Sequence, residues 1–177
     1  MGKRIHTIGH STHSSEHFID LLKAFAIEVL VDIRRYPGSR RYPHFNAEEL
    51  AKSLAENGID YLHMVDLGGR RSPKRDSPNS AWRNTSFRGY ADYMQTDSFQ
   101  HAVNDLQELA SKKSVAIMCS EAVWWSCHRA LVSDYLKWVG WDVLHIIAPG
   151  KEQPHPYTSP ARITDEGLTY RPESELF

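Results

Sequence analysis

The chain has 177 residues, with 21 Lys and Arg against 22 Asp and Glu, and its formal net charge is −1 with histidine neutral. That length suits a single domain, and a hydrophobic content of 41% excludes a disordered chain. No stretch approaches the roughly 18 apolar residues of a membrane-spanning helix. Because residues 1–6 contain no apolar signal segment and the chain has only two cysteines, we expect a protein of the reducing cytoplasm.

Three strands and two helices are predicted in the first half of the chain. The strands are short apolar runs at residues 5–8, 29–33 and 59–65. Between the first two runs, Ser14 or Ser15 can cap a helix with a regular apolar face. A second helix opens at residues 46–49, which resemble a capping box. A long loop then begins at Leu67, and a loop of that length in a compact domain is more often functional than idle.

The second half repeats the alternation and then changes in composition. Helical spacing of apolar residues predicts helices near residues 90–94, 97–109 and 126–139. Strands are predicted at residues 114–119 and 141–147. From Pro149 onwards the chain is rich in Pro and Gly, and residues 163–170 predict a small terminal hairpin.

Five strands that alternate with helices predict an α/β fold, with three layers, a mostly parallel five-stranded sheet and helices on both faces. We expect residues 1–149 to form one domain and residues 150–177 to form a tail whose hairpin packs on it. Ligands bind such sheets outside the carboxyl ends of the strands. Residues that can bind a ligand or take part in catalysis occur near the end of every predicted strand. They include Gly9, His10, Ser11, Asp32, Arg34, Arg70, Cys119, Glu121, Cys127 and His145.

The near-zero net charge conceals two strongly basic segments. Residues 34–41 and 70–88 together hold ten basic residues and one acid, whereas the other 150 residues hold 11 basic and 21 acidic residues. Nine of the ten are arginines, whose planar guanidinium suits phosphate and carboxylate. The pattern predicts a confined anion site on an acidic body and disfavours broad wrapping of a nucleic-acid duplex.

Several short motifs carry a family resemblance. They occupy residues 7–11, 31–34, 37–40, 67–69, 89–94, 118–121 and 127–129. With these motifs in order between about residue 5 and residue 155, the chain resembles the family called domain of unknown function 488. The resemblance brings no assigned activity with it, so the function has to be argued from the residues themselves.

Three residues are the candidates for catalysis. Cys127 is expected in the first turn of a helix, where unpaired N–H groups and the helix dipole favour a thiolate nucleophile. Glu121, in the loop between the two cysteines, is the candidate acid or base, and His10 is a candidate proton carrier. A free cysteine is also commonly a small buried hydrophobic residue, so a structural role stays open for Cys119 and Cys127.

The candidates for anion binding combine backbone N–H groups with the arginines. Gly9 and Ser11 join a strand to a helix, where N–H groups can hold an anion. The full set is Gly9, Ser11, Arg34, Arg40, Arg41, Arg70, Tyr90 and Arg129. We interpret Asp32 as a carboxylate that positions an arginine. The loop after the first strand lacks the glycine patterns of nicotinamide and triphosphate sites, so the cofactor is unknown.

We favour an enzyme that acts on a small phosphorylated or nucleotide-like anion, or on a short stretch of nucleic acid. A non-catalytic nucleotide or nucleic-acid binder would use the same basic segments. A metal or redox thiol protein is the third hypothesis. No metal is favoured, because Cys119, Cys127 and His128, which could hold one, do not have a zinc spacing. The reaction, the substrate and the oligomeric state stay open.

Overall fold

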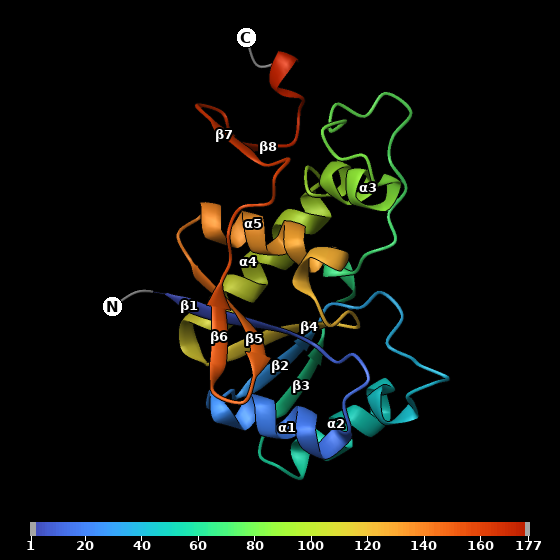
Figure 1. Cartoon of the computed structure of the whole chain (residues 1–177), viewed down its shortest axis with the longest axis vertical. Coiled ribbons are helices and arrows are strands. Elements are labelled where there is room, and N and C mark those ends of the chain that lie inside the picture. The colour runs from blue at the N-terminus through green and yellow to red at the C-terminus, as the bar shows by residue number, and fades with distance from the viewer. Residues whose placement is uncertain (1–2, 176–177) are drawn as a thin grey trace.

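A six-stranded sheet organises residues 3–175, the part of the chain that the computed structural model describes (Figure 1). The strand order is β3-β2-β4-β1-β5-β6. The strands are β1 (Arg4–Gly9), β2 (Val29–Asp32), β3 (Asp60–His63), β4 (Val115–Cys119), β5 (Asp142–Ala148) and β6 (Lys151–Pro154). The described range excludes residues 1 and 2, which belong to the N-terminal segment where no signal sequence is expected, and residues 176 and 177 of the tail.

The first five strands are parallel, as the alternation of strands and helices predicts, but the sheet has one strand more than expected. β6 pairs antiparallel with β5 after a turn at Pro149 and Gly150, whose φ of 72° fits the third position of a type II turn. All four residues of β6 are exposed, so the strand has no apolar alternation. Because that alternation is the signal that identifies a strand, the sequence did not reveal this edge.

Helices cover both faces of the sheet, as predicted (Figure 1). Two pack on one face with Leu30 and Met118, and three pack on the other with Val31 and Ile117. The first two are α1 (Ser15–Ala24) and α2 (Ala47–Ala55), and the other three are α3 (Thr85–Tyr93), α4 (Asp97–Lys112) and α5 (Arg129–Trp138). Alternate residues of one strand therefore enter different cores, which explains why β2 and β4 are buried throughout and, apart from Asp32 at the end of β2, have no charged residue.

The start of α5 and the cap of α2 differ from the sequence prediction. α5 begins at Arg129, because residues Trp124–Ser126 form a separate 3₁₀ turn and Cys127 is extended with φ −143°. Cys127 therefore lies just before the helix, and its sulfur accepts a hydrogen bond from the Arg129 N–H at 3.4 Å. Asn46 precedes α2 but does not cap it, because its Oδ1 accepts the Ser39 N–H at 2.5 Å.

The predicted terminal hairpin is present as β7 (Arg162–Thr164) and β8 (Gly167–Thr169). It packs on α5, where a Cβ added at Gly167 would lie 2.7 Å from the Trp138 ring. Tyr170, which follows β8, is buried and donates its hydroxyl to Asp134 of α5 at 2.8 Å. Within residues 3–175 no helix has the length and the apolar composition needed to cross a membrane.

Candidate functional site

A cavity of about 810 Å³ opens at the carboxyl edge of the parallel strands, where the sequence predicts a site. Its walls come from the loops after β1, β2, β3 and β4 and from the start of α3. Seven of the predicted site residues line it, namely His10, Ser11, Arg34, Arg41, Arg70, Glu121 and Cys127. Cys119 and His128, the other two possible metal ligands, line it as well. The cavity therefore collects residues that are more than 100 positions apart in the chain.

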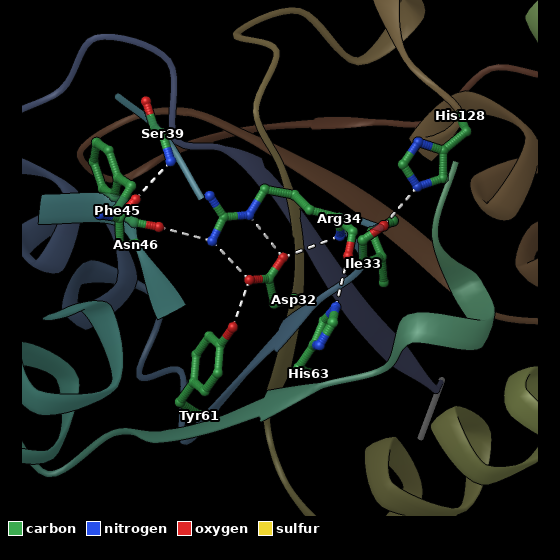
Figure 2. Close-up of polar contacts among 9 residues, drawn as sticks. All are labelled: Asp32, Ile33, Arg34, Ser39, Phe45, Asn46, Tyr61, His63 and His128. Carbon is green, nitrogen blue, oxygen red and sulfur yellow. Dashed lines mark hydrogen bonds and ion pairs between the residues drawn. The ribbon is translucent and has the colours of Figure 1, made fainter. Parts of the chain in front are cut away.

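Arg34 lines the cavity and forms an ion pair with Asp32, which is fully buried behind it and does not line the cavity (Figure 2). The guanidinium donates from Nε to Asp32 Oδ1 at 2.9 Å and from Nη2 to Oδ2 at 2.7 Å. The Tyr61 hydroxyl and the Arg34 N–H also donate to this carboxylate, at 2.6 and 3.0 Å. With its lone pairs used by donors, Asp32 positions Arg34 and has little capacity left to act as a base.

Both the backbone at Arg34 and its guanidinium are held by hydrogen bonds (Figure 2). His63 contacts the Arg34 carbonyl oxygen at 2.7 Å, and His128 contacts that of Ile33 at 2.8 Å. Arg34 Nη2 donates to the Phe45 carbonyl at 2.8 Å. The guanidinium is thus fixed before any ligand arrives, which reduces the entropy that binding would cost.

Two nitrogens of the cavity wall lack a partner. Arg34 Nη1 and His10 Nε2 are buried and make no hydrogen bond within residues 3–175. Four other buried polar atoms share this condition, but their side chains do not line the cavity; they are Trp82 Nε1, Trp124 Nε1, Arg129 Nε and Ser133 Oγ. An unpaired buried polar atom costs about 1–3 kcal/mol, so these two nitrogens indicate a position where a ligand could bind.

His10 is arranged as a hydrogen-bond acceptor. Its ring stacks on Phe45, with the centroids 4.4 Å apart, and its Nδ1 lies 3.0 Å from the Ser11 carbonyl oxygen. Because a carbonyl oxygen only accepts, Nδ1 carries the hydrogen and Nε2 keeps a free lone pair. Burial lowers the pKa of His10 to about 4, with a smaller contribution from Arg34. The ring is therefore neutral at pH 7.

The two cysteine sulfurs lie in contact at 2.6 Å, and neither residue is in a disulfide. Burial alone would raise the pKa of Cys119, but the Cys127 thiol and the Arg129 guanidinium lower it to about 7. Burial and the neighbouring Cys119 raise the pKa of Cys127. The pair therefore loses its first proton near neutral pH, and the resulting thiolate is mainly on Cys119. The sequence had indicated Cys127 as the nucleophile.

Gly9 and Arg129 hold the loop between the two cysteines. A Cβ at Gly9 would lie 1.6 Å from the Glu121 carbonyl oxygen, so only glycine fits there. Arg129 is buried and donates through Nη2 to the Glu121 and Ala122 carbonyls at 3.0 and 3.4 Å. Neither residue lines the cavity, whereas Glu121 lines it and is exposed.

The remaining anion-binding candidates lie in different places. Tyr90 is fully buried outside the cavity and donates its hydroxyl to the Leu67 carbonyl at 2.8 Å. Arg40 is exposed and does not line the cavity. Arg35, which was not singled out from the sequence, lines the rim and donates to the Arg70 carbonyl at 2.8 Å. The rim arginines are therefore Arg35, Arg41 and Arg70.

The three possible metal ligands do not form a chelating group. Within residues 3–175, no set of three or more His, Cys, Asp or Glu side chains has the arrangement of a metal site. His128 Nε2 is bound to the Ile33 carbonyl oxygen, and burial lowers the pKa of His128 to about 4. Its Nδ1 would lie 2.8 Å from a Cβ at Gly69, which explains a glycine at that position.

A second buried polar cluster lies behind the cysteine loop. His145 was expected near the edge of the sheet, but its association with His155 and Asp134 was not predicted. The His155 ring bridges Asp134 Oδ1 and His145 Nε2, each at 2.8 Å, and His145 Nδ1 contacts Thr7 Oγ1 at 2.5 Å. Trp124 stacks on His145 with the centroids 5.0 Å apart. One signal was present in the sequence. Asp134 occurs three residues after Leu131, at a spacing that otherwise places apolar residues on the buried face of α5.

A sequence model of the family described as Domain of unknown function DUF488 matches residues 14–136. The chain belongs to this family. Neither the curated proteins nor the solved structures contain a significant match. In this DUF488 protein the matched segment includes Arg34, Arg70 and both cysteines, whereas His10 precedes it and His155 follows it. The family match thus covers most of the cavity wall but only part of each polar cluster.

Proposed function

We propose that this protein is an enzyme that binds the phosphate or a similar oxyanion of a small ligand and acts on it with His10 and the cysteine pair. One observation supports the proposal above all others: the unpartnered Arg34 Nη1 and His10 Nε2 belong to two side chains that line the same cavity. Arg34 offers the anion a charged donor that is already held in place by Asp32. Charge-assisted hydrogen bonds of this kind are among the strongest that proteins make.

The neutral His10 narrows the class of ligand. An acceptor at Nε2 requires a donor, which a protonated phosphate oxygen, a sugar hydroxyl or a water molecule supplies. In the enzyme that we propose, His10 removes a proton from such a hydroxyl or water. The thiolate shared by Cys119 and Cys127 is the nucleophile. Glu121, which also lines the cavity, is exposed and contributes its carboxylate.

The rim favours a nucleotide-like ligand. Tyr36 is 61% exposed, and the guanidinium groups of Arg35 and Arg70 each lie 5.6 Å from the centre of its ring. An exposed aromatic ring flanked by arginines can stack a base while the arginines attract its phosphate. The same feature supports the second candidate, a non-catalytic binder of single-stranded nucleic acid. That function predicts an affinity that falls steeply with salt concentration and survives changes at His10.

Calorimetric titration of the protein with inorganic phosphate and with nucleoside monophosphates tests the proposal. Arg34→Lys keeps a positive charge beside Asp32 but removes the planar donor at Nη1, and we expect it to weaken phosphate binding by about ten- to a hundredfold. Arg75→Ala is the matched control, because Arg75 is an exposed arginine that does not line the cavity. Equal affinities for both variants and the unchanged protein, with all three folded, would contradict an anion site at Arg34.

A further inference from the structure

The cysteine pair has a geometry that a single nucleophile does not need. Cys119 ends β4 and Cys127 precedes α5, so the fold brings together two residues that are eight positions apart. They are the only cysteines in the chain. Their sulfurs are 2.6 Å apart, near the roughly 2.05 Å of a disulfide bond. Both side chains are buried, yet both line the cavity, which provides a route for a small reagent.

The backbone around the pair is held so that the two sulfurs stay together. The His10 N–H donates to the Cys119 carbonyl at 3.0 Å, and the Ser11 N–H donates to that of Ser120 at 2.9 Å. From the other side, Arg129 Nη2 donates to the Glu121 carbonyl at 3.0 Å. Bonding the sulfurs therefore requires little movement of the loop, and a disulfide that fits the native backbone is not opposed by strain.

We propose that Cys119 and Cys127 form a reversible dithiol–disulfide couple, oxidised by a small peroxide that enters through the cavity. The Cys119 thiolate attacks one oxygen of hydrogen peroxide, the O–O bond breaks, and the hydroxide that leaves takes up a proton to become water. Cys119 is then a sulfenic acid. The sulfur of Cys127 attacks that of Cys119, the S–O bond breaks, and the departing hydroxide takes the Cys127 proton. Two thiols lose two electrons and two protons, and the peroxide becomes two water molecules.

The couple goes beyond the proposed enzymatic function and does not depend on it. Oxidation uses both sulfurs and removes the thiolate, so it would stop any reaction in which that thiolate is the nucleophile. Arg34 and His10 make no hydrogen bond to either cysteine side chain, and their contacts to Asp32, Phe45 and Ser11 involve neither sulfur. We therefore expect the oxidised protein to bind phosphate with the affinity of the reduced protein.

Mass spectrometry of the intact protein after peroxide treatment tests the couple. The reduced chain should lose the mass of two hydrogens, become resistant to iodoacetamide and recover both thiols with dithiothreitol. Cys119→Ser and Cys127→Ser should each prevent the two-hydrogen loss and leave the remaining cysteine to gain oxygen or to link two chains. The inference is overturned if both cysteines of the unchanged protein stay open to iodoacetamide after peroxide, or if each gains oxygen without pairing.

Phosphate titrations of the same samples separate this inference from the proposed function. If the disulfide forms but neither redox form binds phosphate, the anion site is wrong and the couple stands. If the protein binds phosphate before and after peroxide treatment but no disulfide forms, the couple is wrong and the anion site stands. Redox buffers of oxidised and reduced glutathione then give the midpoint potential of the pair.

Discussion

Two buried carboxylates, Asp32 and Asp134, organise two polar clusters that differ in one respect. Each carboxylate is fully buried, accepts several hydrogen bonds and has a tyrosine among its donors. Beside Asp134, both ring nitrogens of His145 and of His155 have hydrogen-bond partners. These bonds connect Thr7 to His145, His145 to His155, and His155 to the Asp134 carboxylate. Beside Asp32, nitrogens of Arg34 and His10 have none.

The difference shows which observation separates a site from a structural cluster. Burial lowers the pKa of His10 to about 4 and, together with His155, that of His145 to about 2, so a depressed histidine pKa is common to both clusters. What differs is that the unpartnered nitrogens beside Asp32 belong to side chains that line the cavity, whereas Trp124 and Arg129, beside the other cluster, do not line it. We therefore propose that the Asp134 cluster serves stability and the Asp32 cluster serves binding, and four predictions test that division.

The largest effect is expected at Asp134. Asp134→Ala leaves His155, the Thr158 hydroxyl and N–H, and Tyr170 without their acceptor in a region closed to water. We expect the free energy of unfolding in urea to fall by about 3–5 kcal/mol. Asp105→Ala, at an exposed position of α4, should change it by less than about 0.5 kcal/mol. A loss below about 1 kcal/mol at Asp134 would mean that the cluster does not stabilise the fold.

The second effect is the pH dependence of stability. His10, His128 and His145 have pKa values lowered to about 4, 4 and 2, so the unfolded chain takes up protons near pH 6.5 that the folded chain does not. Stability from the neutral rings is complete above pH 6.5 and is lost as pH falls towards 4. Urea unfolding at pH 7.5, 6.0 and 5.0 should show this decline. The decline should be smaller in His10→Phe and unchanged in His101→Gln, whose side chain is exposed. A flat profile would contradict buried neutral histidines.

The sequence predicted the parallel sheet, and the edge at which polar and charged residues gather, because both predictions depend on local patterns in the sequence. Apolar runs identified β2 and β4, and the topology rule placed the loops after them at one edge. Contacts between residues of different loops and helices leave no such local pattern in the sequence. The pairing of Cys119 with Cys127, and the burial of Arg129 and Tyr90, follow from how loops and helices pack together in three dimensions. β6 was missed because it lacks apolar alternation, and Asp134 was missed because it is a charged residue at a helical position where the spacing of α5 predicts an apolar one.

The third effect concerns ligand preference. Phosphate carries an O–H near neutral pH and sulfate does not, so only phosphate can donate to the free lone pair of His10 Nε2. We expect calorimetry at pH 7 to show about tenfold tighter binding of phosphate than of sulfate, which corresponds to about 1.4 kcal/mol. His10→Phe keeps a ring that can stack on Phe45 and should abolish the preference. A preference that persists in His10→Phe would show that His10 does not face the ligand.

The smallest effect comes from a matched pair of tyrosines, each of which donates to one carboxylate. The Tyr61 hydroxyl lies 2.6 Å from Asp32 and the Tyr170 hydroxyl 2.8 Å from Asp134, so distance alone predicts the larger loss for Tyr61→Phe. Access to water predicts the opposite order. Tyr61 is half-buried and water can replace its hydroxyl, whereas Tyr170 is 3% exposed. We expect losses in unfolding free energy of about 0.5 kcal/mol for Tyr61→Phe and about 1.5 kcal/mol for Tyr170→Phe. The reverse order would mean that the Asp32 cluster is as closed as that of Asp134, which would remove the basis for assigning it to binding.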